Sequence, residues 1–235
     1  MSVEFADHRV YTPSDDIRHI DWNVTARMNS PYVREYLEDR DVTAWFLLDL
    51  SPSMGFGPAE RPKELVLTDF VATLARLLTR SGNRIGAILY NNQLEKTIPP
   101  RSGRNQVLRL MRDLLRERSL PPGATTDLTV LLNAGLNTLK RRSLVFVISD
   151  FISEEGWERP LALLNRRHEL IAIRLYDPRE TELPDAGMIV VEDAETGEQL
   201  MVDTGHPIFR RRFLEAAQRR ETVLKESITR AGVDL

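Results

Sequence analysis

Three oxygen-bearing side chains, Asp49, Ser51 and Ser53, follow an apolar run over residues 43–48. The run lacks the polar alternation of a half-exposed strand, so it predicts a central strand buried on both faces. Because an extended chain repeats every two residues, the three side chains can point to the same side. Carboxylate and hydroxyl oxygens suit a hard cation such as Mg²⁺. The triplet therefore indicates a metal site, and the alternative is a set of Asx-turns and helix N-caps.

Further oxygen ligands come after later elements. A second apolar run, residues 144–148, ends in Ser149 and Asp150, and the hydroxyls of Thr125 and Thr126 precede a helical pattern. In a parallel α/β sheet the carboxyl ends of neighbouring strands share one edge, where ligands bind. We therefore expect one centre at this edge, formed by Asp49, Ser51, Ser53, Thr126 and Asp150.

These residues resemble the metal-ion-dependent adhesion site of von Willebrand factor A domains. That site combines an Asp-x-Ser-x-Ser triplet with a Thr on a later loop and an Asp that ends a later strand. The resemblance implies that Ser51, Ser53 and Thr126 touch the ion, whereas Asp49 and Asp150 act mostly through bound water. The implied cofactor is Mg²⁺, with Mn²⁺ and Ca²⁺ as alternatives.

The sequence leaves two candidates for the threonine ligand, Thr125 and Thr126. The family usually places its Thr directly before a small polar residue and a Leu. Asp127 and Leu128 follow Thr126 in that order, so we prefer Thr126.

The remaining apolar patterns predict alternating strands and helices. Residues 84–90 and 170–173 are typical of buried strands, and 94–98 of an antiparallel edge strand that Pro99 and Pro100 end. The predicted helices carry apolar stripes at Val66, Phe70, Leu74 and Leu77, at Val107, Leu108, Met111, Leu114 and Leu115, and at Leu128, Leu131, Leu132, Leu136 and Leu139. Together they predict an α/β fold, an open and mostly parallel sheet with helices on both faces, Rossmann-like and, by the resemblance, von Willebrand factor A-like.

The strand–helix alternation ends after residue 173. Residues 188–191 and 199–202, joined by Glu195-Thr196-Gly197, predict a β-hairpin or a strand with an extension. Apolar positions within 209–228 predict an amphipathic C-terminal helix. Earlier in the chain, Pro121-Pro122-Gly123 predicts a break before the two threonines.

Composition and charge exclude several classes of function. The 235-residue chain is 42% hydrophobic and 29% charged, which suffices for a full core. Its net charge is -3 and its basic residues are scattered, so we expect no nucleic-acid partner. The absence of cysteine excludes disulfides and thiolate metal sites. No apolar run has the length of a membrane span, and the first residues are too polar for a signal peptide. We expect a cytoplasmic protein, with peripheral membrane association as an alternative.

Residues 1–40 are predicted to form a charged extension, and residues 41–235 the α/β domain. Arginines and carboxylates alternate in the extension, which predicts a loop-rich segment held by Arg–carboxylate pairs. We expect three residues to anchor it, Tyr11, Ile20 and Trp22. The alternative is a docking surface for a partner protein, with Arg and Trp side chains as its anchors.

The motif in residues 9–27, Arg-x-Tyr-x-Pro-x-Asp-Asp-x-Arg-x-Ile-Asp-Trp-x-x-x-Ala-Arg, is similar to the bacterial group known as domain of unknown function 58. Segments 177–180, 183–187 and 195–198 are similar to that group as well, so the resemblance covers nearly the whole chain. Ser14 stands where the group usually has Gly. The membrane segments at the front of many members do not occur in this sequence, which leaves a soluble branch and a shortened start as expectations.

The resemblance implies a partner, a MoxR-type AAA+ ATPase, with which this chain would act as an adaptor in the assembly or maturation of a target complex. A bound metal with an open coordination position would attract an Asp or Glu side chain of an unknown client protein. The predicted function is thus a non-enzymatic, Mg²⁺-dependent protein-binding domain.

Two other functions stay open. A strand ending in Asp also begins phosphohydrolases that attack with the carboxylate, so Asp49 could act as a Mg²⁺-dependent nucleophile. Those sites need a second acid two residues on, where this chain has Ser51. The sequence contains no phosphate-binding loop, dinucleotide-binding turn or nucleophile elbow.

The other alternative is a structural interaction domain with an empty metal site, in which Asp49 and Asp150 bond backbone amides. Ligand spacing is absent among the histidines His8, His19, His168 and His206.

Overall fold

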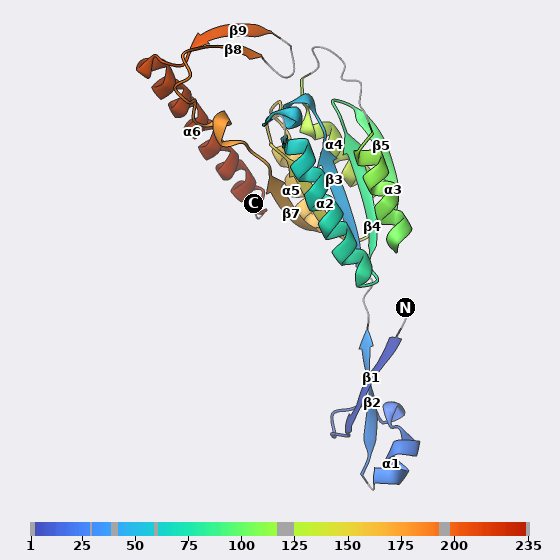
Figure 1. Cartoon of the computed structure of the whole chain (residues 1–235). Coiled ribbons are helices and arrows are strands. Elements are labelled where there is room, and N and C mark those ends of the chain that lie inside the picture. The colour runs from blue at the N-terminus through green and yellow to red at the C-terminus, as the bar shows by residue number, and fades with distance from the viewer. Residues whose placement is uncertain are drawn as a thin grey trace. The chain divides into compact units, whose positions relative to one another are not determined.

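The computed structural model describes residues 3–28, 30–38, 42–58, 61–116, 125–192 and 198–233. The chain divides into two compact units, Met1–Asp41 and Val42–Leu235 (Figure 1). The predicted break at Pro121-Pro122-Gly123 and the predicted turn at Glu195-Thr196-Gly197 lie outside the described residues.

The larger unit is built on a five-stranded sheet in the order β5-β4-β3-β6-β7. β3 lies at the centre, and six of its seven residues are buried, as its continuous apolar run predicts. β3, β4, β6 and β7 run parallel, and β5 pairs antiparallel with β4 at one edge. The strands are β3 (Thr43–Asp49), β4 (Arg84–Tyr90), β5 (Leu94–Arg101), β6 (Leu144–Ser149) and β7 (Glu169–Arg174).

Helices cover both faces of this sheet and give three layers (Figure 1). They are α2 (Lys63–Arg80), α3 (Arg104–Leu114), α4 (Leu128–Thr138), α5 (Glu158–Arg167) and α6 (Pro207–Arg230). α2 and α3 pack on the face that carries Phe46 and Leu48 of β3. α4, α5 and α6 pack on the opposite face, which carries Trp45 and Leu47. Because side chains alternate along a strand, β3 supplies both cores, and the structure confirms the predicted Rossmann-like α/β fold.

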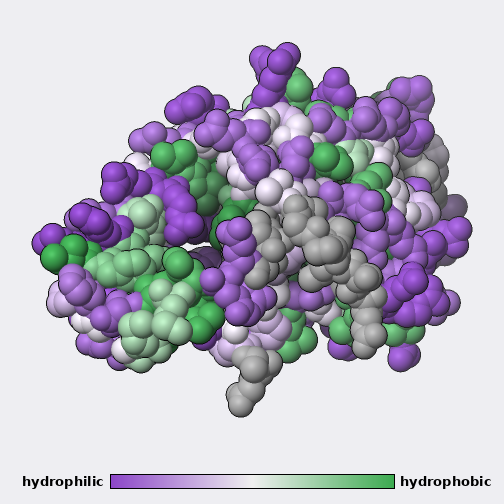
Figure 2. Space-filling view, turned by 90° about the horizontal axis from the view of Figure 1, so that it is seen from above, coloured by the Kyte–Doolittle hydropathy of each residue, from purple (hydrophilic) through white to green (hydrophobic). Residues whose placement is uncertain are grey.

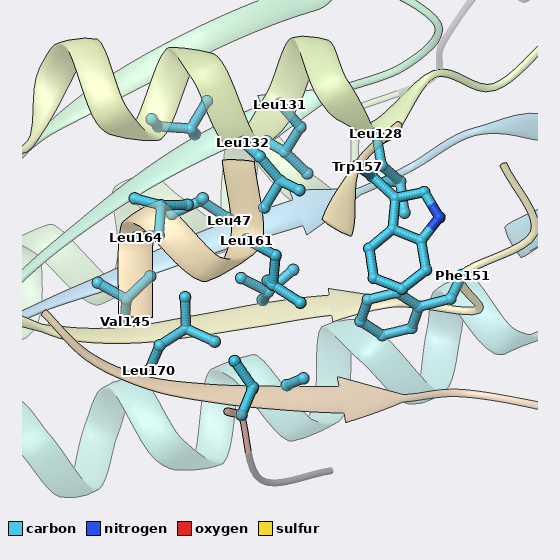
Figure 3. Packing of buried hydrophobic residues seen from close by; sticks show 14 of the residues in the cluster. Leu47, Leu128, Leu131, Leu132, Val145, Phe151, Trp157, Leu161, Leu164 and Leu170 are labelled. Carbon is cyan, nitrogen blue, oxygen red and sulfur yellow. The ribbon is translucent and has the colours of Figure 1, made fainter. Parts of the chain in front are cut away.

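The core on the α4–α5 face is rich in leucine (Figure 3). Leu47, Leu132 and Leu164 enter it from three different elements. Gly135 allows α4 to approach β3 closely, because a Cβ at this position would lie 2.8 Å from Cδ2 of Leu47. α4 is therefore held directly behind the strand that ends in Asp49.

The order of the strands creates a crevice at one edge of the sheet. From β3 the chain passes through α2 to β4 on one side, and it later returns to β6 on the other side of β3. α2 lies on one face of the sheet and α5, which follows β6, lies on the other, so the two connections diverge. Ligands bind at such a switch point in open α/β sheets. The two strands that flank it lead into Asp49 and Asp150.

Helix α2 buries a different stripe from the predicted one. Its buried apolar residues are Leu67, Val71 and Ala75, whereas Phe70 is 39% exposed and Leu77 is 61% exposed. The helix is apolar on two neighbouring faces, and the apolar residues of each face, predicted and observed, recur at helical spacing. Contact with the sheet decides which of them faces inward.

The predicted stripe of α3 is also partly wrong. Leu110 and Leu114 are buried, whereas Leu108 is 54% exposed and Leu115 is 68% exposed. Leu115 is the C-cap residue, so it lies beyond the last helical residue and leaves the stripe. The α4 stripe is correct at four of its positions, since Leu128, Leu131, Leu132 and Leu139 are buried.

The edge strand β5 runs through Pro99 and Pro100 to Arg101, so the prediction that these prolines end the strand is wrong. Proline lacks an N–H group and therefore cannot donate to a neighbouring strand. At a sheet edge, the N–H groups that face away from the sheet have no strand partner to lose. Consecutive residues of a strand face opposite ways, so the edge position accommodates one of the two prolines. The other is accommodated by an irregularity in the pairing with β4 between Ile85 and Ala87, where Pro99 and Pro100 oppose a single residue.

The smaller unit is a two-stranded antiparallel sheet. β1 (Val3–Val10) pairs with β2 (Tyr32–Glu38), and a 3-10 helix η1 (Ile17–His19) and a helix α1 (Trp22–Met28) lie between them in the chain. The predicted loop-rich character is therefore wrong. Backbone pairing organises these strands without the apolar alternation that a sequence pattern detects.

The predicted Arg–carboxylate pairs are present in this unit. Arg9 Nη1 donates to Asp15 Oδ2 at 2.7 Å, and Arg18 Nη2 donates to Asp16 Oδ2 at 2.6 Å. The hydrogen bonds from Arg18 lower the pKa of Asp16 to about 2. Trp22 is 69% exposed and so is not the predicted anchor. It opens α1, and no residue of α1 is buried, which leaves the indole without a core to enter.

The segment before α6 forms the predicted hairpin, in which β8 (Met188–Glu192) pairs antiparallel with β9 (Gln199–Asp203). Met188, Val190, Leu200 and Met201 are 62%, 58%, 66% and 67% exposed. Seen from above, hydrophobic side chains gather on the side of the surface where Figure 1 places this hairpin (Figure 2). Of the helices in the described ranges, none combines the length and the apolar composition needed to cross a bilayer.

Candidate metal centre

Asp49 is the last residue of β3 and is fully buried. Its Oδ1 accepts the backbone N–H of Ser51 at 3.0 Å, and its Oδ2 accepts the hydroxyl of Ser149 at 2.6 Å. Ser149 ends β6, so this second bond joins the ends of the two strands that flank the crevice. The Asp49 carboxylate therefore has a fixed orientation at the switch point.

The hydroxyls of Ser51 and Ser53 lie side by side. Their Oγ atoms are 3.2 Å apart, and the two residues are 2% and 7% exposed. Ser51 is the N-cap of the 3-10 helix η2 (Pro52–Gly55), but its side chain makes no capping bond. Two neighbouring ligands of an octahedral Mg²⁺ with Mg–O distances near 2.1 Å lie about 3 Å apart. The serine hydroxyls thus fit two adjacent positions around this ion.

The two threonines differ in burial. Thr126 is 1% exposed, whereas Thr125 lies on the surface. The hydroxyl of Thr126 donates to Asn92 Oδ1 at 3.4 Å. The backbone N–H of Asp127 donates to the Tyr90 hydroxyl at 2.8 Å. These bonds place Thr126 beside the end of β4, at the same edge as the serines.

Asp150 directly follows β6 and is 1% exposed. Its Oδ1 accepts the N–H of Ile152 at 2.9 Å. Its Oδ2 accepts a hydrogen bond from the Nζ of Lys63 at 2.7 Å, and the same Nζ donates to Glu180 Oε1 at 2.5 Å. Lys63 is the first residue of α2 and is 5% exposed. Glu180 ends the 3-10 helix η3 (Pro178–Glu180).

Two buried carboxylates give this edge a strong preference for a cation. Burial and, to a smaller extent, the charge of Asp150 raise the pKa of Asp49 to about 6, although hydrogen bonds from Ser149 and Ser51 act in the opposite direction. A cation would relieve the repulsion between the two carboxylates. In the described part of the chain, no three side chains of His, Cys, Asp or Glu form a metal-binding group. The centre therefore depends on its hydroxyls as well as on its carboxylates.

Unusual backbone conformations flank the centre. Asn92 follows the end of β4 with φ +53°, and Phe151 follows Asp150 with φ +59°. A positive φ is costly for a phenylalanine, and such strain concentrates at functional sites. The Phe151 ring lies 5.5 Å from that of Trp157, centroid to centroid, which fixes the turn after Asp150 (Figure 3).

The sequence did not identify Lys63, Ser149 or Glu180 as parts of the centre. A signal for Lys63 existed, because a lysine in the first turn of a helix works against the helix dipole. Pro62, the N-cap of α2, makes no side-chain capping bond that would compensate for it. The role of Glu180 had no local signal, because 117 residues separate it from Lys63.

The fold and its polar edge define a Rossmann-like α/β protein with an oxygen-lined centre at the switch point of its sheet. The chain belongs to the family described as protein of unknown function DUF58, whose model matches residues 7–223. An uncharacterised protein of Mycobacterium tuberculosis is 35% identical over 234 residues, which cover 99% of this chain and 73% of that protein.

Two solved structures are similar at low identity. The conserved hypothetical protein BatB from Bacteroides thetaiotaomicron is 11% identical with a TM-score of 0.49, and the match covers 81% of this chain and 98% of that one. The manganese-loaded TRAP protein of Plasmodium vivax is 20% identical with a TM-score of 0.41, and the match covers 58% of each chain.

Proposed function

We propose that this chain is a non-enzymatic protein-binding domain that depends on a divalent metal, Mg²⁺ in the first place. The observation that carries the proposal is the arrangement at the switch point. Two serine hydroxyls lie 3.2 Å apart beside the fully buried Asp49, and Asp150 follows the neighbouring strand. This is a hard-oxygen donor set of the kind that Mg²⁺ prefers.

In this proposal, Ser51, Ser53 and Thr126 hold the ion, and Asp49 and Asp150 act through bound water. When bound, the ion supplies a positive charge with a coordination position open to a carboxylate of a partner. The chain's own contribution is orientation. Ser149 fixes the Asp49 carboxylate at 2.6 Å, and the N–H of Ile152 fixes that of Asp150 at 2.9 Å.

The partner in this proposal is a MoxR-type AAA+ ATPase, together with a client protein that offers an Asp or Glu. The resemblance of the Asp49-x-Ser51-x-Ser53 motif to a metal-ion-dependent adhesion site supports the carboxylate. The ATPase is what the resemblance of the N-terminal motif to the DUF58 group implies. The chain would act as an adaptor in assembling or maturing a target complex.

One specific observation favours a second candidate, a structural interaction domain without metal. Both carboxylates accept backbone N–H groups, Asp49 from Ser51 and Asp150 from Ile152, and Lys63 supplies a cation to Asp150. A carboxylate with such partners can be stable without a metal. The two candidates differ in whether the serine hydroxyls bind a divalent ion.

Calorimetric titration with Mg²⁺ and with Mn²⁺ tests the metal centre. We expect binding by the wild type and loss of binding in Ser51→Ala/Ser53→Ala, because the variant lacks two direct ligands. A matched control, Ser81→Ala/Ser102→Ala, removes two exposed serines and should bind as the wild type does. Equal affinity in all three proteins would exclude the proposed centre.

Capture of partners from native lysate tests the adaptor role. The tagged wild type is used in Mg²⁺ and in chelator, and Asp49→Ala is used in Mg²⁺, each followed by mass spectrometry. We expect an AAA+ ATPase with the wild type in Mg²⁺ and its loss in the other two samples. The same partners in all three samples would place binding elsewhere, and the exposed Trp22 is then the first candidate.

A further inference from the structure

Lys63 joins three segments that are far apart in the sequence. It opens α2, and its Nζ contacts Asp150 after β6 and Glu180 at the end of η3 at 2.7 and 2.5 Å. The Lys63 side chain is 5% exposed, that of Asp150 is 0% exposed and that of Glu180 is 15% exposed. The Nζ also lies 5.9 Å from the centroid of the Phe56 ring. The ammonium is thus enclosed by protein groups.

Helix stability does not explain a lysine at this position. The N-terminus of a helix carries partial positive charge, so an ammonium there is unfavourable. A buried ammonium is costly as well unless it is paired and hydrogen-bonded. What Lys63 does achieve is an ion pair with both Asp150 and Glu180, in which it balances one of their two negative charges. Its position therefore points to a role at the polar edge of the sheet.

This role puts Lys63 in competition with a divalent ion. Oδ1 of Asp150 is held by the N–H of Ile152, and Oδ2 accepts the hydrogen bond from Lys63. Oδ2 is thus the oxygen that would turn to a metal-bound water, and Lys63 takes it. A divalent cation next to the ammonium is also opposed by charge repulsion, which is strong in a buried site.

We infer that Lys63 is an internal competitor of the divalent metal, which holds Asp150 in the metal-free protein and releases it to the ion while keeping its bond to Glu180. The inference rests on the proposed metal centre and adds its regulation. Lys63 lowers the affinity of the site, and Glu180 provides the second carboxylate on which the ammonium remains. Metal binding is then coupled to the contact between α2 and η3.

Metal affinity in charge-changing variants tests this role, measured by Mg²⁺ calorimetry and by Mn²⁺ electron paramagnetic resonance on the full chain. Lys63→Met removes the competitor and should raise the affinity by about tenfold or more. The control Lys140→Met removes an exposed lysine and should leave the affinity unchanged. Unchanged or lower metal affinity in Lys63→Met would mean that Lys63 stabilises the structure of the site and does not compete with the metal. That result would overturn the inference.

A second variant decides the matter if Lys63→Met does not fold. Glu180→Gln takes the second carboxylate from Lys63, which then depends more on Asp150, so metal affinity should fall. Unchanged or higher affinity in Glu180→Gln contradicts the competition.

The failure of this inference is distinguishable from the failure of the proposed function. Higher metal affinity in Lys63→Met together with metal-independent partner capture upholds the competition and removes the adaptor mechanism. Metal binding that disappears in Ser51→Ala/Ser53→Ala but is unchanged in Lys63→Met upholds the metal centre and removes the competition. Absence of metal binding in both the wild type and Lys63→Met removes both.

Discussion

Replacing Asp49 with Asn should stabilise the metal-free protein near neutral pH and abolish metal binding. Asn has the shape of Asp and keeps an oxygen that can accept the N–H of Ser51, but it has no charge to bury. Burial, with the charge of Asp150, raises the pKa of Asp49 from 3.8 to about 6, a rise of about 2 units. At 1.36 kcal/mol per unit, the ionised side chain costs the folded state about 3 kcal/mol. We expect the free energy of unfolding to rise by up to about 3 kcal/mol at about pH 7.5.

This gain must depend on pH. The folded protein keeps the proton of Asp49 over a pH range in which the unfolded chain has lost it. The stability that this group contributes is therefore fully present below 3.8 and is lost as the pH rises through about 6. Wild type and Asp49→Asn should then have nearly equal stability at about pH 4, and should differ most above about pH 7.

Urea denaturation in chelator, followed by tryptophan fluorescence, measures both effects. The control is Asp69→Asn, which neutralises an exposed carboxylate of α2 and should change stability by less than about 0.5 kcal/mol at either pH. A loss of stability in Asp49→Asn at about pH 7.5, or a gain of equal size at about pH 4, would refute the reasoning. The first result would mean that the ionised carboxylate is well solvated by its hydrogen bonds. The second would mean that the gain has another cause than charge.

Two further changes test the packing of the larger unit by urea denaturation. Gly135→Ala places a Cβ 2.8 Å from Leu47 Cδ2 and should lower the free energy of unfolding by about 1–3 kcal/mol. In the control Gly55→Ala, the added Cβ meets no atom within 4 Å, so this change should be nearly neutral. Equal effects of the two changes would contradict the close approach of α4 to β3. Glu221→Gln breaks the ion pair that joins α6 to Arg174 of β7. Arg174 lowers the pKa of Glu221 below 4.5, so the stability lost in the variant, about 1 kcal/mol, is present above 4.5 and should vanish as the pH falls through the lowered pKa.

The central part of the fold was predictable because its patterns are local. The run that became β3 is apolar without interruption, and a central parallel strand imposes that composition by burying both faces. The stripe of α2 was not predictable in the same way. Leu67 and Phe70 belong to two neighbouring apolar faces of that helix, and the choice between them is made by the sheet, which the local sequence does not contain.

The residues of the candidate centre also differ in whether the local sequence could identify them. Asp49, Ser51 and Ser53 are adjacent along the chain, so their spacing alone suggested a cation site. Lys63 and Glu180 were missed because their relation to Asp150 exists only in three dimensions. The exposure of Trp22 was not predicted for a different reason. A tryptophan can anchor a short segment only by packing into a core, and no residue of α1 is buried.

The hydrogen bond between Ser149 and Asp49 also bears on how the protein is made. It closes a loop of 100 residues, and the bonds of Lys63 to Asp150 and Glu180 span 87 and 117 residues. Contacts of such separation form late in folding, because a long stretch of chain must be ordered before they can stabilise it. During synthesis, about half of the larger unit emerges after the apolar strand β3 begins and before its partner β6 follows. A polypeptide stalled before residue 144 would therefore expose that strand, and a cell would gain from a chaperone that protects it until the sheet can close.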